Sequence, residues 1–352
     1  MLGRRCRHDH SRRARLSSSY CASDPPGQSP QSARWHLLDI TNGRSPPAAQ
    51  GGVAAFALDG LEHVLYIDAG GSTHELTHVT GDVITRWPAK DLTKLTHAPT
   101  ARLETSLSAI VAGYDQTAFY TGLDGDIQNL LWDWSGDQLK LARSTNITSS
   151  AHGQKVRRGT ALISSRLGNT QHVFYINADG DVHELRMTKT TNSSLVWRDH
   201  TINSHTNAAV GASQLTGYVM GVSQHLIYLD DYGHVRELYA DWSGDDWAAW
   251  QKEDLTQRTS APTPAKESGL QSYVVRDVAH LIMVTSEGRL LDLNWDYNAG
   301  QSTGWHYVDI TSNAGAPNAA TSTGLTAFAL DGVQYIDYVD TKGHVIEVTQ
   351  LP

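Results

Sequence analysis

A histidine and an acidic residue recur twelve positions apart along this chain. The pairs are His63 with Glu75, His172 with Glu184, His225 with Glu237, and His280 with Asp292. Imidazole donates one or two hydrogen bonds, and a carboxylate accepts several. Two chemistries are therefore open. The partners satisfy each other inside the protein and fix strand register, because an unpaired buried charge is costly. Alternatively, they line a pocket and offer a donor and an acceptor to the hydroxyl groups of a ligand.

The pairs lie in similar stretches, "HVLYIDAGGSTHEL" from residue 63, "HVFYINADGDVHEL" from residue 172 and "HLIYLDDYGHVREL" from residue 225. Each stretch reads as two apolar strands joined by a turn of Gly, Asp or Asn. With the first turn centred on Ala69, His63 and Glu75 are equidistant from it. We therefore predict that they face each other across the hairpin. Two further repeats carry Thr117 with Asn129 and Tyr335 with Glu347, so four of six pairs are complete.

The turn glycine recurs every 53 to 55 residues, at 71, 125, 180, 233, 288 and 343. A second signature, W-x-x-x-D-L/I-T, runs out of phase with it at 35–41, 87–93, 250–256 and 305–311, with weaker copies at Trp197 and at 146–148. Periods of this length are typical of repeat architectures. We interpret the signature as structural, with Trp and Thr packing between repeats and Asp or Thr capping a turn.

Each repeat reads as four short strands, the size of a propeller blade, and no segment of comparable length shows helical periodicity. The sequence predicts an all-β fold, a six-bladed β-propeller of four-stranded antiparallel blades over residues 35–352. The sixth repeat ends without a W-x-x-x-D-L/I-T strand, whereas residues 35–41 provide a spare one. We expect this N-terminal strand to join the last blade and close the ring, which leaves no blade with a missing edge.

Residues 1–34 differ in composition from the rest, with seven Arg against two Asp, and are expected to form a disordered basic tail. They contain both cysteines, Cys6 and Cys21, and no visible signal peptide, which leaves a cytoplasmic location or secretion without a signal. The whole chain has 28 basic and 37 acidic residues, so the remainder has a net charge near −14. That charge argues against nucleic acid as a partner. No apolar run is long enough for a membrane span, and no thiolate metal site or other cofactor is expected.

Tryptophan is concentrated in turns after the acidic strand, "LWDWSGD", "ADWSGDDW" and "NWDYNAG". Trp132, Trp242 and Trp295 stand there beside aspartates. An exposed indole can stack on a sugar ring while a neighbouring carboxylate accepts its hydroxyl groups. The other interpretation is that these rings cover the contact between neighbouring blades, and the sequence leaves both open.

The repeats resemble those of the fungal-type fucose-specific six-bladed β-propeller lectins. In that family an Arg and a Glu twelve residues apart hold the sugar, and an aromatic residue of the neighbouring blade stacks on it. Here "HVLYIDAGGSTHE", "HVFYINADGDVHE" and "HLIYLDDYGHVRE" match the frame. The resemblance places His63, His172, His225 and His280 at the Arg position. It places the stacking aromatic near Leu58, Met220, Val275 and Leu330, with Phe56, Tyr218, Tyr273 and Phe328 two residues earlier.

The resemblance implies a lectin-like protein with several similar glycan pockets between its blades, since repeated weak sites gain from multivalency. Glycans or glycoconjugates are then the expected partners, and the oligomeric state stays open, with a homodimer as one arrangement. A non-catalytic protein-interaction scaffold is the alternative. We do not expect an enzyme, because the polar residues repeat with the blades and no catalytic motif is present.

Overall fold

The computed structural model describes residues 47, 49–58, 61–79, 88–112, 115–133, 141–189, 194–203, 211–244, 246–266, 268–298, 304–321, 325–330, 333–342 and 345–350. Residues 1–34 and the strand expected at 35–41 lie outside the described residues. The predicted tail and the predicted closing strand therefore stay predictions.

Six antiparallel sheets follow one another along the described chain, and we number them as blades 1 to 6. Blade 1 contains β1 (Ala49–Leu58), β2 (Leu61–Asp68), β3 (Thr73–Val79) and β4 (Ala89–Asp91). Blade 2 contains β5 (Ser108–Ala112), β6 (Asp115–Thr121), β7 (Ile127–Asp133) and β8 (Leu141–Asn146). Blade 3 contains β9 (Ile163–Leu167), β10 (Thr170–Ile176), β11 (Val182–Lys189) and β12 (Leu195–Thr201).

The remaining blades repeat this order. Blade 4 contains β13 (Gly211–Met220), β14 (Ser223–Asp230), β15 (Val235–Asp241) and β16 (Gln251–Asp254). Blade 5 contains β17 (Leu270–Val275), β18 (Val278–Val284), β19 (Leu290–Asp296) and β20 (His306–Asp309). Blade 6 has three described strands, β21 (Leu325–Leu330), β22 (Val333–Val339) and β23 (Val345–Gln350).

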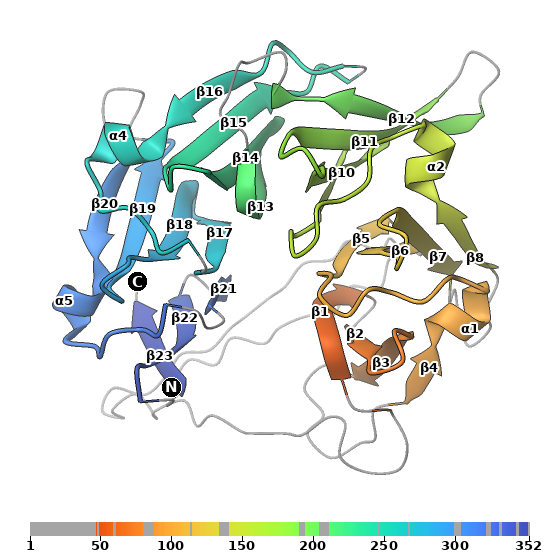
Figure 1. Ribbon diagram of the computed structural model, residues 1–352, viewed down its shortest axis with the longest axis horizontal. Coiled ribbons are helices and arrows are strands. Elements are labelled where there is room, and N and C mark those ends of the chain that lie inside the picture. The colour runs from red at the N-terminus through yellow and green to blue at the C-terminus, as the bar shows by residue number, and fades with distance from the viewer. Residues whose placement is uncertain are drawn as a thin grey trace, which may run out of the picture. The chain divides into compact units, whose positions relative to one another are not determined.

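The blades are arranged around a ring, as predicted for a six-bladed propeller (Figure 1). The first strand of each blade lies toward the centre and contacts the first strand of the next blade, from β1 through β5, β9, β13 and β17 to β21. The fourth strands lie at the outside (Figure 1). Second and third strands of blades 2 to 5 are therefore covered on both faces by neighbouring blades, which explains why most of their residues, polar ones included, are buried.

The hydrophobic core lies between blades, in the contact layers that we call seams. Alternate residues of one strand point to opposite faces of the sheet. In β10, Val173 and Tyr175 pack in the seam with blade 2, whereas Phe174 and Ile176 pack in the seam with blade 4. All four side chains are fully buried. Whether a residue stands at an odd or an even position of the strand (its parity) therefore decides which seam its side chain enters. His172 is two residues before Phe174, so it points to the same seam, with blade 4.

The hairpin register differs from the prediction by one residue. Gly70, not Ala69, is the centre of the first turn, so His63 lies opposite Thr77, and Glu75 lies opposite Leu65. The predicted partners are thus diagonal rather than directly opposed. The same offset occurs in blades 3, 4 and 5. Diagonal residues on one face stay within reach of long side chains, so the pairing survives the corrected register.

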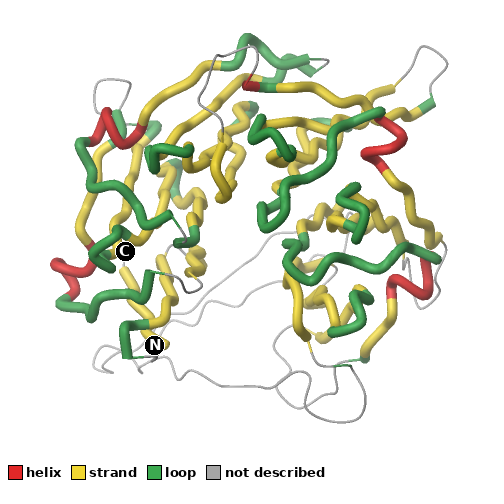
Figure 2. Tube along the Cα trace, in the orientation of Figure 1, coloured by secondary structure: helices red, strands yellow, loops and turns green. Residues whose placement is uncertain are grey.

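The Asp of the W-x-x-x-D-L/I-T signature, or the Asn of its weaker copy, caps a short helix, and Figure 2 shows these helices in red after the outer strands. These helices are α1 (Leu92–Thr96), α2 (Ile147–Ala151), α4 (Leu255–Thr259) and α5 (Ile310–Ala314). The side chain of the preceding Asp or Asn accepts a hydrogen bond from the backbone N–H three residues later, as an N-cap does. Helices of five residues are too short to produce a periodic pattern, which is why the sequence did not predict them.

The threonine of the same signature ties each helix to its blade. Its hydroxyl oxygen accepts a hydrogen bond of 2.7 or 2.8 Å from the first backbone N–H of the third strand. The four pairs are Thr93 with Thr73, Thr148 with Ile127, Thr256 with Val235, and Thr311 with Leu290. The Asp and Thr of the signature are therefore structural, as predicted, because they satisfy buried backbone donors where the outer strand turns back.

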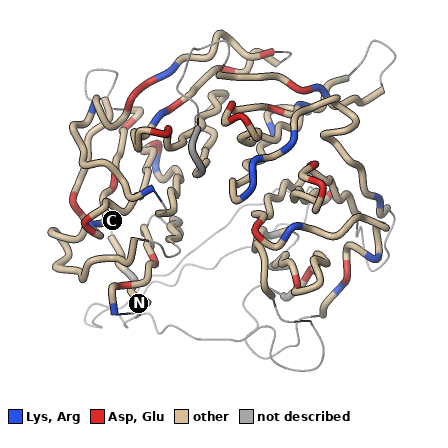
Figure 3. The backbone as a smooth tube through the Cα atoms, viewed as in Figure 1, with Lys and Arg blue, Asp and Glu red and all other residues tan. Residues whose placement is uncertain are grey.

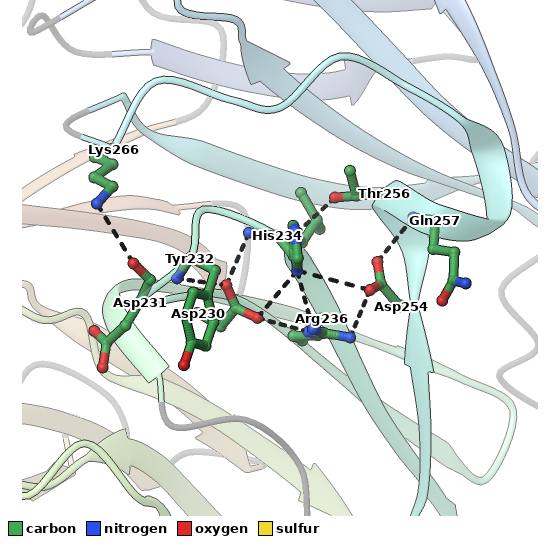
Figure 4. A network of polar contacts seen from close by, with 10 residues as sticks. Asp230, Asp231, Tyr232, His234, Arg236, Asp254, Thr256, Gln257 and Lys266 are labelled. Carbon is green, nitrogen blue, oxygen red and sulfur yellow. Dashed lines mark hydrogen bonds and ion pairs between the residues drawn. The ribbon is translucent and has the colours of Figure 1, made fainter.

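A second repeated device fixes the turn between the second and third strands (Figure 4). In blade 4 the Asp230 carboxylate accepts hydrogen bonds from the backbone N–H groups of Tyr232 and His234 at 2.9 Å. It also accepts a bond of 2.8 Å from Arg236, which reaches on to Asp254 at 2.6 Å. The network joins the turn, the third strand and the helix cap of one blade.

Asp68 performs the same role in blade 1, and its charge makes the turn sensitive to pH. Burial by itself would raise the pKa of Asp68, but hydrogen bonds from His74 and from the backbone N–H groups of Ser72 and Gly70 outweigh burial and lower it. A carboxyl whose pKa is lower in the folded than in the unfolded state stabilises the fold above its unfolded pKa, and this contribution is lost as the pH falls through its folded pKa.

We therefore expect Asp68→Asn to lower the melting temperature at pH 6 and to differ progressively less from the parent protein below about pH 4. Asparagine fits the turn, because Asn177 stands at this position in blade 3 and accepts from the N–H of Asp181 at 2.8 Å. Melting curves of both proteins from pH 3 to pH 7 test this. A difference that is constant across the range would show that the charge of Asp68 has no part in stability.

Candidate functional site

All four predicted pairs are in direct contact. The Nδ1 atom of each histidine lies within hydrogen-bond distance of a carboxylate oxygen, at 2.8 Å for His63–Glu75, 2.5 Å for His172–Glu184, 2.8 Å for His225–Glu237 and 2.9 Å for His280–Asp292. Every one of these side chains is buried. By strand parity each pair faces the seam with the following blade.

The aromatic residues of the first strands stack on these histidines. Phe56 lies opposite His63 with the ring centres 4.7 Å apart, and Tyr218 lies opposite His225 at 4.5 Å, both nearly parallel. Tyr273 stacks on His280 at 5.1 Å. The aromatic thus fixes the histidine of its own blade in place.

A tryptophan of the following blade donates its indole N–H to the glutamate. Trp132 reaches Glu75 at 3.2 Å. Trp247 reaches both oxygens of Glu184, at 2.9 and 3.0 Å, and Trp305 reaches Glu237 at 3.1 Å. The three indoles come from different places in their blades, namely the third strand, the loop before β16 and the residue before β20. One geometry is therefore assembled from different parts of the repeat.

The seam between blades 4 and 5 contains a cavity of about 250 Å³, whose wall includes His225, Glu237 and the rings of Tyr239, Trp295 and Trp305. Glu253 and Arg258 form an ion pair that also lines this cavity. The Trp295 indole N–H is buried and has no hydrogen-bond partner within the described part of the chain. This donor is therefore unused within the described chain, which is unusual for a buried polar group.

Glu237 is held as an acceptor at the wall of this cavity. His225 and Trp305 donate to it, and so does the hydroxyl of Tyr218 at 3.3 Å. Burial raises the pKa of Tyr218 well above its usual value, and the neighbouring Glu237 raises it further, so the phenol keeps its proton. A carboxylate has about four acceptor positions. Three are used, which leaves roughly one for a ligand hydroxyl.

Two further seams contain cavities of the same kind. The cavity between blades 5 and 6 measures about 450 Å³ and is lined by His280, Asp292 and Asn294 of blade 5 and Gln334 of blade 6. The cavity between blades 3 and 4 measures about 330 Å³ and includes Glu184 in its wall. The acidic member of a His–acid pair therefore lines all three cavities, with the next blade on the other side, and His225 and His280 join it in two of them.

The sequence matches no model of a known protein family, and no curated protein sequence matches it either. Solved structures match it in fold. The BP39L lectin of Burkholderia pseudomallei superposes with a TM-score of 0.62 at 12% identity, covering 86% of this chain and 80% of that one. A lectin of Aleuria aurantia, described as a six-bladed β-propeller with a fucose recognition mode, gives 0.53 at 12% identity over 86% and 92% of the two chains. The SapL1 lectin, solved with alpha methyl fucoside, gives 0.51 at 17% identity over 87% and 94%.

The chain has the fold of the six-bladed propeller lectins. The architecture predicted from its repeats is thereby confirmed. Within this lectin fold Figure 3 shows acidic and basic residues interspersed along the blades rather than separated into blocks. Among the described residues no group of three His, Cys, Asp or Glu side chains converges to hold a metal ion. No described helix has the length and apolar character that crossing a membrane would require.

The predicted tryptophans divide between wall and core of this propeller lectin fold. Trp132 is fully buried, and Trp242 is nearly so and packs against His172, so both rings lie within seams rather than on an exposed turn. Trp295 lines a cavity. Trp247 and Trp305 were not among the predicted site residues. Their only signal was membership of a Trp-rich turn and of the repeated outer-strand signature.

Proposed function

We propose that this protein is a lectin-like, non-catalytic carbohydrate-binding protein that holds single sugar units in the seams between its blades. The observation that carries the proposal is the cavity between blades 4 and 5. It combines a buried carboxylate, Glu237, with the rings of Trp295 and Trp305 and an indole donor that lacks a partner. A sugar offers hydroxyl groups to the carboxylate and apolar ring faces to the tryptophan rings.

The size of the cavity agrees with a small ligand. About 250 Å³ is near the lower end of small-molecule sites, which start at about 300 Å³, and suits one sugar unit better than a peptide segment. The exposed large apolar side chains of the described residues lie in different parts of their blades. They are Val53 on a first strand, Leu195 and Tyr307 on fourth strands, Val222 between first and second strands, Leu123 and Tyr232 between second and third strands, and Tyr297 after a third strand. These observations favour glycan binding over a protein-interaction scaffold.

The identity of the sugar stays open between fucose and related sugars. The resemblance places an arginine where this chain has His225 and His280. Arginine offers a rigid fork of five donors, whereas the Nδ1 of each histidine is already engaged with its carboxylate, which leaves one ring nitrogen. Fewer donors change which hydroxyl arrangement the pocket recognises.

A glycan array probed with the directly labelled full chain tests the proposal. We expect binding to a set of glycans that share one terminal sugar, and we expect that free sugar at millimolar concentration abolishes it. A blank array at high protein concentration, with the protein shown to be folded by its circular dichroism, would refute the proposal. The protein-interaction scaffold would then be the favoured function.

A further inference from the structure

One position that differs between the seams lies two residues beyond the acidic residue of the third strand, or beyond Asn129 in blade 2. This position shares the face of the acidic residue, because side chains alternate along a strand. In chain order the residues are Thr77, Leu131, Arg186, Tyr239, Asn294 and Thr349. Blade 3 alone places a permanent positive charge there, in the wall of the cavity that it shares with blade 4.

Arg186 is buried, with 5% of its surface exposed, which is rare for arginine unless it is paired. Its guanidinium lies 5.4 Å from the ring centre of Trp242. One Nη atom donates to Asp246 at 2.7 Å, and the other lies 3.1 Å from Nε2 of His200. Its Nε–H has no hydrogen-bond partner among the described residues. Arg186 therefore has donor capacity that the protein does not use.

The partner of this buried cation lies at the surface. The Asp246 side chain is 72% exposed, although the Arg186 side chain that it pairs with is only 6% exposed. One oxygen of Asp246 serves both Arg186 and the backbone N–H of Trp247. Arginine binds carboxylates best through two parallel hydrogen bonds. The single bond from Asp246 therefore leaves the better geometry available to another carboxylate.

The other charges around the cavity are compatible with such a ligand. Glu184 already accepts hydrogen bonds from His172 on one side and from the Trp247 indole through both oxygens. Burial lowers the pKa of His200, and Arg186 lowers it further, so its imidazole is neutral near pH 7 and leaves Arg186 as the cation of the cavity. Trp247 and Trp250 supply apolar surface in the same wall.

We propose that the seam between blades 3 and 4 binds a sugar unit bearing a carboxylate, and that the ligand carboxylate replaces Asp246 on Arg186. Asp246 then acts as an internal stand-in that covers the cation when the site is empty. The proposal rests on the proposed lectin function and adds a ligand class for one seam. A purely structural ion pair between the two blades is the competing explanation, and the two differ in what removing Asp246 does.

The test is a titration of the full chain with methyl glucuronide and methyl glucoside, which differ in whether C6 is a carboxylate or a hydroxymethyl group. Methyl galacturonide and methyl N-acetylneuraminate are titrated alongside. We expect an acidic sugar to bind more tightly than the neutral one. We expect Asp246→Asn to raise its affinity by about threefold to tenfold, since a competing ion pair of this exposed type is weak. Arg186→Lys, which keeps the charge but loses the fork, should lower the affinity by about tenfold.

Glu104→Gln is the matched control, because Glu104 is the exposed partner of an arginine, Arg158, outside the cavity; it should leave acidic-sugar binding unchanged. Asp246→Asn removes the carboxylate partner of a buried cation, so its circular dichroism and urea midpoint are compared with those of the parent protein before its affinity is interpreted. No preference for an acidic sugar in either the parent protein or Asp246→Asn would overturn the inference. Neutral glycans captured on the array would in that case still support the proposed function, so the two failures are distinguishable.

Discussion

Replacing Glu237 with glutamine is expected to abolish binding at the seam between blades 4 and 5. The carboxylate takes up donors from His225, Trp305 and Tyr218. The amide group of glutamine turns one acceptor into a donor, which faces one of these N–H or O–H groups. It also removes the charge that strengthens a hydrogen bond to a sugar hydroxyl. A charge-assisted bond contributes about 1.5–3 kcal/mol, so we expect a loss of about 100-fold in affinity at this seam.

Isothermal titration with the sugar identified on the array checks this through the number of sites. A site weakened by about 100-fold drops out of the titration, so the stoichiometry should fall by one, while the remaining sites keep their affinity. Asp292→Asn should remove a second site in the same manner, and the double variant should lack both, as expected for sites without shared partners. An unchanged stoichiometry in folded Glu237→Gln would mean that this seam binds no sugar.

Replacing His225 with leucine is expected to destabilise the protein by about 3 kcal/mol or more, because it leaves a buried carboxylate with one donor fewer. His225 and Glu237 are 4% and 2% exposed, so the lost donor is one that the protein itself supplied inside the seam. The change also removes the stacking of Tyr218 on the imidazole. The midpoint of urea unfolding, compared with the parent protein at pH 7, measures the loss.

The double variant His225→Leu with Glu237→Leu tests whether the two residues stabilise the protein as a pair or independently of each other. Replacing both partners of a buried ion pair with apolar side chains often restores stability, so we expect the double variant to regain at least half of the loss. His306→Leu, at an exposed histidine on β20, serves as control and should shift the midpoint little. A double variant less stable than either single variant would contradict the assignment of His225 and Glu237 as a mutually satisfied pair.

The architecture could be predicted from the sequence because every repeat contains the same pattern of strands and turns. A turn with glycine at positive φ, such as Gly71 at 81° and Gly180 at 92°, separates the same two apolar strands in successive repeats. The Asp of the outer strand is a local cap, and the Thr bonds to the first residue of the third strand of the same repeat, 20 or 21 positions earlier. Short-range chemistry of this kind leaves a pattern in the order of residues, and so does the His–acid pair within one hairpin.

The walls of the cavities could not be predicted in the same way. Glu75 and Trp132 are 57 positions apart, and Glu237 and Trp305 are 68 apart. The three tryptophans stand at non-equivalent positions of their blades, although the three glutamates that they contact are equivalent. No fixed spacing between tryptophan and glutamate therefore exists in the sequence. The Arg186–Asp246 pair spans 60 positions and occurs in one seam only, so it leaves no repeat to recognise. The one-residue error in hairpin register arose because the sequence gives the turn but not its central residue.

The indole that crosses three of the described seams sets the boundaries of the segment that encodes a whole pocket. A single blade contains the His–acid pair of the seam with the following blade and the tryptophan of the seam with the preceding blade. A blade that is copied or transplanted alone therefore contains half of each of two sites and completes neither. The segment that encodes one whole pocket between blades 4 and 5 begins in β13, at Tyr218, and ends at Trp305, just before β20. The unit to exchange in engineering, and the unit whose duplication creates a working new pocket, is therefore out of phase with the blade.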